Sequence, residues 1–319
     1  MNLLKEISAN KKIKNPVIYG FSGKALTDQE KYFFSKSGPI GFIVFARNIE
    51  DKSQLKSLTN SLKELMEGEV LILVDQEGGR VARMTEPQWK KYPAGQHFAD
   101  LYLQNPEQAR EAIYKNFQEI ADDLIEVGIN VDCAPVLDIL TEKTHQVIGN
   151  RVYGNNAAQV ADLGRKVCEG LLSRGVFPVI KHIPGHGRGT SDSHLELPVV
   201  ETSLDELRKT DFAPFQKLND QKFAMTAHVL FTSIDKENCA TVSPDAIKII
   251  RQEIGFKNIL MSDDLSMKAL KGSFVEKTKA VINAGCDLVL HCNGDMQEMS
   301  EIDSALPRIS DDFWGRFVA

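Results

Sequence analysis

A carboxylate and an imidazole lie two residues apart in a glycine-rich segment near the middle of the chain. Lys181–Gly187 reads Lys-His-Ile-Pro-Gly-His-Gly, and Asp192 and His194 follow it. The proline and glycines disfavour a helix, so we expect a loop, in which alternate residues of an extended stretch share a face. A carboxylate beside an imidazole orients it and raises its pKa, which suits a general acid/base near neutral pH. An isolated Asp-x-His would more often belong to an ordinary surface loop, and it is the surrounding Lys-His-Ile-Pro-Gly-His-Gly that favours a catalytic role.

A second candidate lies at the end of an apolar run, where Met261–Leu265 reads Met-Ser-Asp-Asp-Leu. A strand end would hold a nucleophilic carboxylate rigidly below a bound substrate. Asp263 could face the barrel interior as such a carboxylate, with Asp264 serving the following helix or the substrate surroundings. The alternative is that Ser262 or an aspartate only caps the next helix.

Three further charged residues could hold a ligand. Asp75 ends the run before Gln-Glu-Gly-Gly-Arg, Arg83 follows shortly after, and Arg151 lies on a later loop. Carboxylate and guanidinium groups bind sugar hydroxyls by multiple hydrogen bonds. Ion pairing of Asp75 with an arginine, and simple surface exposure of Arg151, are the alternatives.

A metal site is an alternative to these assignments. His182, His186, Asp192 and His194 have ligand chemistry, but Pro-Gly between the first two histidines excludes the helix on which His-x3-His binds zinc. The sequence gives even less support to a phosphate-binding loop at Gly185–Gly189. Neither Gly-x-Gly-x-x-Gly nor a P-loop motif is present. We therefore expect no metal and no cofactor.

The elements that must position these residues are eight short apolar runs separated by amphipathic stretches. Runs this apolar are typical of strands buried on both faces. Helical spacing marks Asp51–Met66, Glu107–Val127, Ala157–Ser173 and Leu204–Leu218, the last with Ser203 as N-cap and Glu206 at the reciprocal position. The runs are Val17–Phe21, Gly41–Ala46, Val70–Asp75, Asn130–Val136, Phe177–His182, Phe223–His228, Asn258–Asp263 and Asp287–Cys292.

Eight strand–helix units predict an α/β fold, a single (β/α)8 TIM-type barrel that forms one catalytic domain over residues 1–319. A doubly wound open sheet is the rival and would normally need fewer strands. In a barrel the site lies at the C-terminal face of the strands. Polar residues end several runs, and we expect them to line a common site: Asp75, Asp138, Lys181, His182, His228, Asp263 and His291.

The composition of the chain indicates which binding partners and which cellular compartment to expect. The net charge of −6 argues against nucleic-acid binding. Five cysteines without a Cys-x-x-Cys pair indicate buried thiols and a reducing compartment. The N-terminal residues form no apolar signal segment, and no run approaches the roughly 18 apolar residues of a membrane span. The expectation is a cytoplasmic protein without a membrane partner.

Together these segments resemble glycoside hydrolase family 3, and within it the single-domain β-N-acetylglucosaminidases (β-hexosaminidases) of the NagZ type. The segment 181–194 is highly specific, and the other motifs are collinear with it. They are Gly-Phe-Ile-Val-Phe at 41–45, Val-Asp-Gln-Glu-Gly-Gly-Arg-Val at 74–81, Ala-Pro-Val-Leu-Asp-Ile at 134–139, Ala-Met-Thr-Ala-His-Val at 224–229, Ser-Asp-Asp-Leu-Ser-Met at 262–267 and Ala-Gly-Cys-Asp-Leu-Val-Leu at 284–290.

The resemblance implies a role for each candidate residue. Asp263 would be the nucleophile, and His194 would be the acid/base with Asp192 as its dyad partner. Binding of N-acetylglucosamine (GlcNAc) in the first subsite would fall to Asp75, Arg83, Arg151, Lys181 and His182. The departures from the family pattern, such as Asn150 where aspartate is common and Ile183 where phenylalanine is common, remove no catalytic group.

The resemblance also implies a function in peptidoglycan recycling. The substrates would be GlcNAc-containing muropeptides, cleaved as GlcNAc-1,6-anhydro-MurNAc with or without peptide, by a monomer. Because the acid is an imidazole rather than a carboxylate, phosphorolysis is a conceivable side activity. A family 3 β-glucosidase and a non-catalytic sugar-binding barrel are the alternatives. The first normally takes its acid from another part of a longer chain, and the second would not need Asp263, Asp192 and His194.

Overall fold

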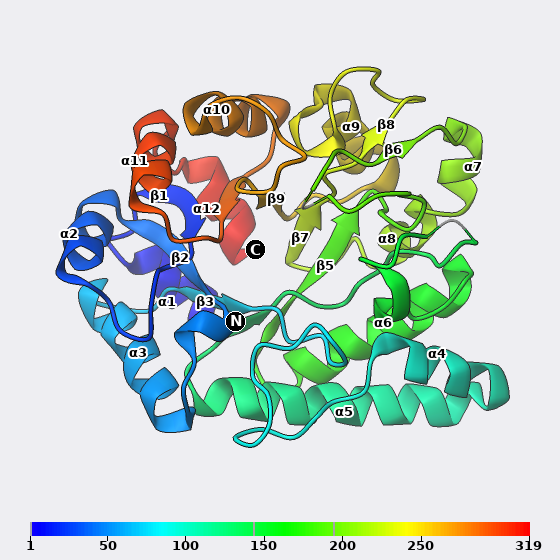
Figure 1. Cartoon of the computed structure of the whole chain (residues 1–319), viewed down its shortest axis with the longest axis horizontal. Coiled ribbons are helices and arrows are strands. Elements are labelled where there is room, and N and C mark those ends of the chain that lie inside the picture. Colours follow the sequence, from blue (N-terminus) through cyan, green and yellow to red (C-terminus); the bar gives the residue numbers. More distant parts are fainter. Residues whose placement is uncertain (1, 143, 194) are drawn as a thin grey trace.

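Eight short apolar runs form eight parallel strands that close into a barrel in the computed structural model, which describes residues 2–142, 144–193 and 195–319 (Figure 1). Around the barrel the order is β1-β10-β9-β7-β5-β4-β3-β2, and β1 pairs with both β2 and β10. The predicted (β/α)8 barrel is confirmed, and closure excludes the open sheet. The barrel strands are β1 (Asn15–Tyr19), β2 (Pro39–Val44), β3 (Leu71–Val74), β4 (Val131–Asp132), β5 (Phe177–Ile183), β7 (Phe223–Thr226), β9 (Ile259–Asp264) and β10 (Leu288–His291).

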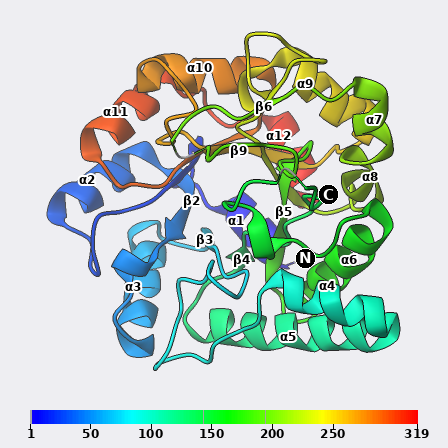
Figure 2. The ribbon, with the colours of Figure 1, turned by 45° about the vertical axis from the view of Figure 1, so that its right-hand side comes forward.

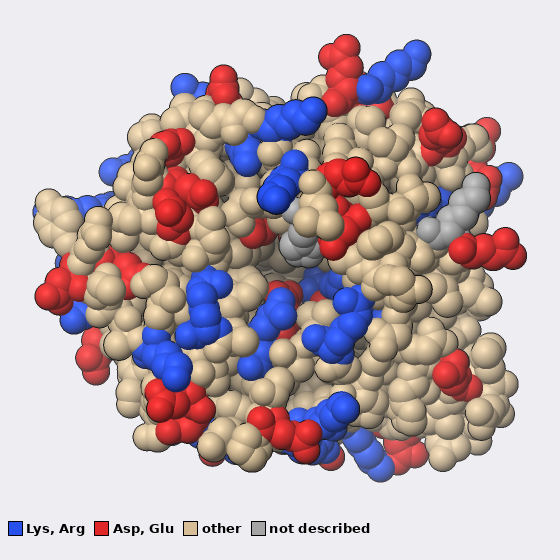
Figure 3. Space-filling view, in the orientation of Figure 1, with Lys and Arg blue, Asp and Glu red and all other residues tan. Residues whose placement is uncertain are grey.

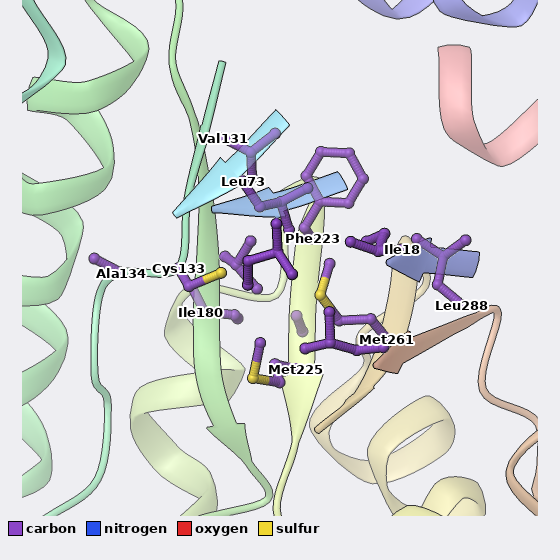
Figure 4. Packing of buried hydrophobic residues seen from close by; sticks show 14 of the residues in the cluster. Ile18, Leu73, Val131, Cys133, Ala134, Ile180, Phe223, Met225, Met261 and Leu288 are labelled. Carbon is purple, nitrogen blue, oxygen red and sulfur yellow. The ribbon is translucent and has the colours of Figure 1, made fainter. Parts of the chain in front are cut away.

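The barrel strands are buried along nearly their whole length because both of their faces are covered. Side chains from different strands, among them Leu73, Val131, Phe223, Met261 and Leu288, pack in the space between the strands (Figure 4). All five cysteines are buried thiols. This packed interior gives the strand ends a rigid base.

Helices surround the barrel (Figures 1 and 2). The leucine stripe predicted at 51–66 forms a helix that buries Leu55, Leu58 and Leu62. The α-helices are α1 (Asn2–Ala9), α2 (Asp28–Ser37), α3 (Lys52–Leu65), α4 (Gly95–Gln104), α5 (Pro106–Glu126), α6 (Ala157–Leu172), α7 (Leu204–Lys209), α8 (Phe212–Lys217), α9 (Pro244–Ile249), α10 (Phe274–Ala284), α11 (Met296–Ala305) and α12 (Asp311–Val318). Shorter turns are the 3-10 helices η1 (Ala46–Asn48), η2 (Gly149–Arg151) and η3 (Ala240–Val242), and the π-helix η4 (Ile250–Ile254).

The single helix predicted over Leu204–Leu218 is wrong, because the segment divides into α7 and α8. Pro214 lies in the first turn of α8, where its missing amide is tolerated. In one continuous helix its ring would meet the carbonyl of Thr210. Ser203 does cap α7 by accepting from the amide of Glu206, whose carboxylate pairs with Arg188 at 2.9 Å.

Two strands lie outside the barrel, and the sequence did not indicate either of them. β6 (Val199–Val200) and β8 (Leu230–Phe231) pair in parallel, and they join the ends of the segments that follow β5 and β7. Their hydrogen bonds connect residues 198–200 to the segment that follows β7. Within the described residues, no helix is both long and apolar enough to cross a bilayer.

Candidate active site

A cavity of about 310 Å³ opens where the barrel strands end. This volume is at the lower end of the roughly 300–1,000 Å³ typical of small-molecule sites, which suits a ligand the size of one sugar. Figure 3 shows Lys and Arg side chains gathered at the edge of the hollow near the middle of this face. The lining includes six of the eight predicted site residues: Asp75, Arg83, Arg151, Lys181, His182 and Asp263.

The floor of the cavity is built around one buried ammonium group. Lys181, near the end of β5, is only 2% exposed, and its Nζ lies 2.8 Å from Asp75 Oδ1 and 2.6 Å from Glu77 Oε1. Asp75 directly follows β3, and Glu77 lies two residues further on. A buried charge is tolerated only when it is paired, so this lysine and the two carboxylates fix one another in place.

Two arginines complete this charged floor. Arg151 binds Glu77 with both ends of its guanidinium, through Nε to Oε2 at 2.8 Å and Nη2 to Oε1 at 2.7 Å. Arg83 donates from Nη2 to Asp75 Oδ2 at 3.1 Å, and its guanidinium lies 5.1 Å from the centre of the Phe45 ring. Its buried Nε has no hydrogen-bond partner among the described residues.

The charges of the floor hold one another in their ionised forms. Burial alone would raise the pKa of each carboxyl, but Lys181 and Arg83 lower the pKa of Asp75 well below its ordinary value. Against the same burial, Arg151 and Lys181 lower the pKa of Glu77 to about 2. In turn, burial would lower the pKa of Lys181, but Asp75 and Glu77 raise it well above its usual range. The floor therefore keeps its charges at neutral pH.

His182 is held from behind by a buried carboxylate. Its Nδ1 lies 2.7 Å from Asp138 Oδ2, and Asp138 is fully buried. Asp138 also accepts from the backbone amide of His186 at 2.6 Å. Burial opposes ionisation of Asp138, but His182 keeps the pKa of this carboxyl below its ordinary value. The pairing fixes the ring of His182 and leaves its Nε2 side for the cavity.

Asp263 lies where the pairing of β9 is irregular. Met261 pairs with Leu288 and Asp264 with Leu290, so β9 has one more residue than β10 between these pairs. Such a bulge redirects side chains, and it places Asp263 at the cavity wall. The backbone amide of Asp264 donates to Asp263 Oδ1 at 2.8 Å.

Asp264 lines the cavity together with Asp263 but also binds backbone amides. Its carboxylate accepts from the amides of Ser266 at 2.9 Å and Cys292 at 3.0 Å, which fixes the loop after β9. It caps no helix, since the next helix begins only after Ser273. Ser262 does not cap a helix either, because its hydroxyl accepts from the amide of Leu290 at 3.0 Å.

Not every polar strand end reaches the cavity. His228 is buried behind β9, with Nε2 3.0 Å from the carbonyl oxygen of Asp264 and Nδ1 2.7 Å from Thr241 Oγ1. His291 is buried toward α11 and pairs with Glu298 at 2.8 Å. Asp138 lies behind His182 and does not line the cavity either. The expectation that Asp138, His228 and His291 line a common site is therefore wrong, because each of these side chains is buried against neighbouring elements instead.

The predicted acid/base pair is on the loop after β5. His194 lies outside the described residues, so its prediction is not tested. Asp192 is described, and its carbonyl oxygen accepts from the amides of Leu195 at 2.9 Å and Glu196 at 3.0 Å. Ser193, between the two predicted residues, lines the cavity.

The roles of three residues that support the site were not predicted from the sequence. Glu77 is the partner of Lys181 and Arg151, and His186 forms part of the cavity wall. Asp138 was expected to line the cavity but instead supports His182. The two-residue spacing of Asp75 and Glu77 would have indicated a shared face in an extended stretch. Among the described residues, no group of three His, Cys, Asp or Glu side chains is arranged to hold a metal ion.

Comparison with known proteins gives consistent likenesses. Residues 12–310 match the N-terminal domain of glycosyl hydrolase family 3. The chain is 34% identical over 282 residues to a β-hexosaminidase of Methylobacillus flagellatus, covering 87% of this chain and 80% of that protein.

Two solved structures are also similar. NagZ from Neisseria gonorrhoeae, in complex with N-trifluoroacetyl-D-glucosamine, superimposes with a TM-score of 0.88 and 34% identity, covering 96% of this chain and 89% of that one. A family 3 β-N-acetylglucosaminidase from Paenibacillus gives a TM-score of 0.87 and 29% identity, with 98% of this chain and 60% of that chain covered.

Proposed function

The chain belongs to glycoside hydrolase family 3 and is a β-N-acetylhexosaminidase, and we propose that it releases terminal β-linked GlcNAc with retention, through a covalent intermediate on Asp263. The observation that carries the proposal is the position of Asp263 on the bulge of β9, at the wall of a sugar-sized cavity whose floor is the Lys181 network. A carboxylate held on a strand end is preorganised for attack on an anomeric carbon.

The sugar would be held by the charged floor. The ionised Asp75 accepts hydrogen bonds from hydroxyls, while Lys181, Arg83 and Arg151 donate them. The Arg83 guanidinium, held by Asp75, lies at the cavity wall. His182, fixed by Asp138, offers Nε2 to a further hydroxyl. The ion pairs inside the floor and the binding of sugar are compatible, because each carboxylate and guanidinium has further hydrogen-bonding positions.

The reaction would proceed in two displacements. In the first, an Asp263 carboxylate oxygen bonds to the anomeric carbon while the bond to the departing oxygen breaks. That oxygen takes a proton from the His194 imidazolium, oriented by Asp192. In the second, neutral His194 takes a proton from water, whose oxygen displaces Asp263 from the anomeric carbon. Net inversion at each step restores the β configuration.

The natural substrates would be GlcNAc-containing muropeptides, GlcNAc-1,6-anhydro-MurNAc with or without peptide, in peptidoglycan recycling. The family resemblance and the likeness to NagZ support this assignment. We place the activity in the cytoplasm, since the five buried thiols suit a reducing compartment. One barrel domain, acting as a monomer without cofactor, would suffice.

A chromogenic β-GlcNAc glycoside tests the proposal directly. Asp263→Ala is expected to lower kcat on the order of 10⁴-fold or more, because the covalent route is lost. Asp205→Ala, at an exposed position on α7, is the matched control and should retain full activity. The first anomer formed, observed by proton NMR, should be β. Near-normal turnover by Asp263→Ala, or α-GlcNAc as first product, would refute the assignment.

The same assay with a β-glucoside separates the related alternatives. We expect cleavage of the GlcNAc glycoside and much weaker cleavage of the glucoside. Preference for the glucoside would instead indicate a β-glucosidase, and turnover of neither would indicate a non-catalytic sugar-binding barrel.

A further inference from the structure

The loop after β5 consists of an anchored part and a part that carries the predicted acid/base. The anchored part, residues 186–189, is fixed on several sides. Asp138 accepts from the amide of His186, and Thr144 Oγ1 donates to the carbonyl oxygen of Gly187 at 2.6 Å. Arg188 Nε donates to Asp211 Oδ2 at 2.8 Å. These contacts join the segment to the loop after β4 and to the start of α8.

Close backbone packing holds the anchored part from below. A Cβ atom on Gly187 would lie 2.0 Å from the carbonyl oxygen of Ile139, so only glycine allows this approach. The amide of His145 donates to the carbonyl oxygen of Gly189 at 3.2 Å. The loop after β4 and the first part of the loop after β5 therefore form one packed unit.

A side-chain hydrogen bond connects this unit to the part with the predicted dyad. His186 Nε2 lies 3.3 Å from Ser193 Oγ, and both residues are almost completely buried at the cavity wall. Ser193 is covalently joined to both Asp192 and His194. At 3.3 Å the bond is long for its type, so it constrains the segment without locking it.

The chemical state of His186 suits this contact. Burial and the nearby His182 together lower its pKa to about 4, while Asp138 and Asp263 act in the opposite sense. At neutral pH the ring is therefore uncharged. It can hydrogen-bond the Ser193 hydroxyl through Nε2 without adding a positive charge to this wall of the cavity.

We propose that Ser193 and His186 are positioning residues for the acid/base: their contact holds Ser193, which lies between Asp192 and His194 in the sequence, to the anchored residues 186–189. The proposal rests on the proposed function, since it assumes that this segment delivers the proton. Loss of the contact would leave the proposed nucleophile and the sugar-binding floor intact. Only proton transfer to the departing oxygen would become slower.

Leaving-group dependence provides a readout that a merely structural role would not change. A phenyl β-GlcNAc glycoside needs a proton on its departing oxygen, whereas a 2,4-dinitrophenyl glycoside departs without one. For Ser193→Ala we expect kcat/KM on the phenyl glycoside to fall about tenfold, a fraction of the roughly 10²–10⁴-fold that general acid catalysis contributes. On the dinitrophenyl glycoside kcat/KM should stay within about twofold, because that first step needs no acid.

Controls isolate the hydroxyl. Ser193→Thr keeps a hydroxyl and should retain most of the activity on the phenyl glycoside, while Ser61→Ala on α3 should change neither substrate. Thermal melting shows whether each variant is folded. An equal loss on both glycosides, or no loss on the phenyl glycoside by folded Ser193→Ala, would overturn the proposal.

A double-mutant cycle tests whether Ser193 acts through His186. The double variant His186→Ala/Ser193→Ala should lose no more activity on the phenyl glycoside than His186→Ala alone, because the contact is already broken. Multiplicative losses would contradict this route. Failure of the underlying function is distinguishable, because then wild type would cleave neither glycoside or Asp263→Ala would remain active.

Discussion

The floor and the rim of the cavity are held by interactions of different kinds. In the floor, buried charges pair at 2.6–2.8 Å, and removing one partner of such a pair typically costs about 3–5 kcal/mol. In the rim, formed by residues 144–150 and 183–193, Thr144 and Ser193 make neutral hydrogen bonds worth about 0.5–1.5 kcal/mol each, and an ion pair between Arg188 and Asp211 anchors the segment from behind. The groups predicted to bind sugar are thus held by buried charge pairs, while Ser193, next to the predicted acid/base in the sequence, is held by a neutral hydrogen bond.

The largest effect is expected from the centre of the floor. Lys181→Met keeps the length of the side chain but removes the charge that Asp75 and Glu77 share. We expect a loss of about 3–5 kcal/mol in the free energy of unfolding, together with a large fall in kcat/KM. Urea unfolding and steady-state kinetics measure the two effects.

Lys115→Met is the matched control for this variant. Lys115 forms an exposed pair with Glu111 on α5, and its loss should cost less than about 0.5 kcal/mol. Equal stability losses in the two lysine variants would show that the floor is not the rigid region described here.

A smaller effect is expected from Glu77→Gln, which keeps shape and removes the charge that holds Arg151 and Lys181. KM should rise about tenfold with a smaller change in kcat, since binding groups are displaced while Asp263 is untouched. Glu111→Gln, at an exposed position, should leave KM unchanged. A fall in kcat without a rise in KM would contradict a binding role for this network.

The same variant should alter the acid stability of the protein. The pKa of Glu77 is about 2 in the folded protein, below its ordinary value of 4.5, so its charge stabilises the fold above about pH 4.5. This contribution is lost as the pH falls from 4.5 toward 2. The urea midpoint of wild type should therefore fall more steeply over this range than that of Glu77→Gln. Parallel curves would show that Glu77 is not ionised in the fold as described.

The smallest effect is expected at the rim. Thr144→Val removes the hydrogen bond to Gly187 and should cost about 0.5–1.5 kcal/mol at most. We expect only a few-fold loss of kcat/KM, larger on the phenyl than on the dinitrophenyl glycoside. If Thr144→Val lowered the free energy of unfolding as much as Lys181→Met does, the floor and the rim would not differ in the way described.

The sequence predicts the barrel well because the pattern of a short apolar run is repeated eight times along the chain. Each apolar run marks one strand, and the ends of parallel strands must meet at one face, which brought Asp75, Lys181 and Asp263 together. The break between α7 and α8 was missed, although Pro214 could have indicated it. The short strands β6 and β8 have too few residues to show a pattern.

Side-chain partners were harder to predict than the residues that line the cavity. Glu77 and Lys181 lie far apart in the sequence and meet only because β3, β4 and β5 are adjacent in the barrel. The bulge that directs Asp263 depends on register between strands, which no local pattern encodes. His194 was named from its motif, and it lies outside the described residues.

The most direct test of the central claim is to trap the covalent intermediate. A 5-fluoro GlcNAc glycosyl fluoride slows both steps, but its good leaving group lets the glycosyl-enzyme accumulate. After peptic digestion, mass spectrometry should find the sugar on the peptide with Asp263, and Asp263→Ala should remain unlabelled. A label on any other residue, or turnover of the reagent without a covalent adduct, would contradict Asp263 as the nucleophile.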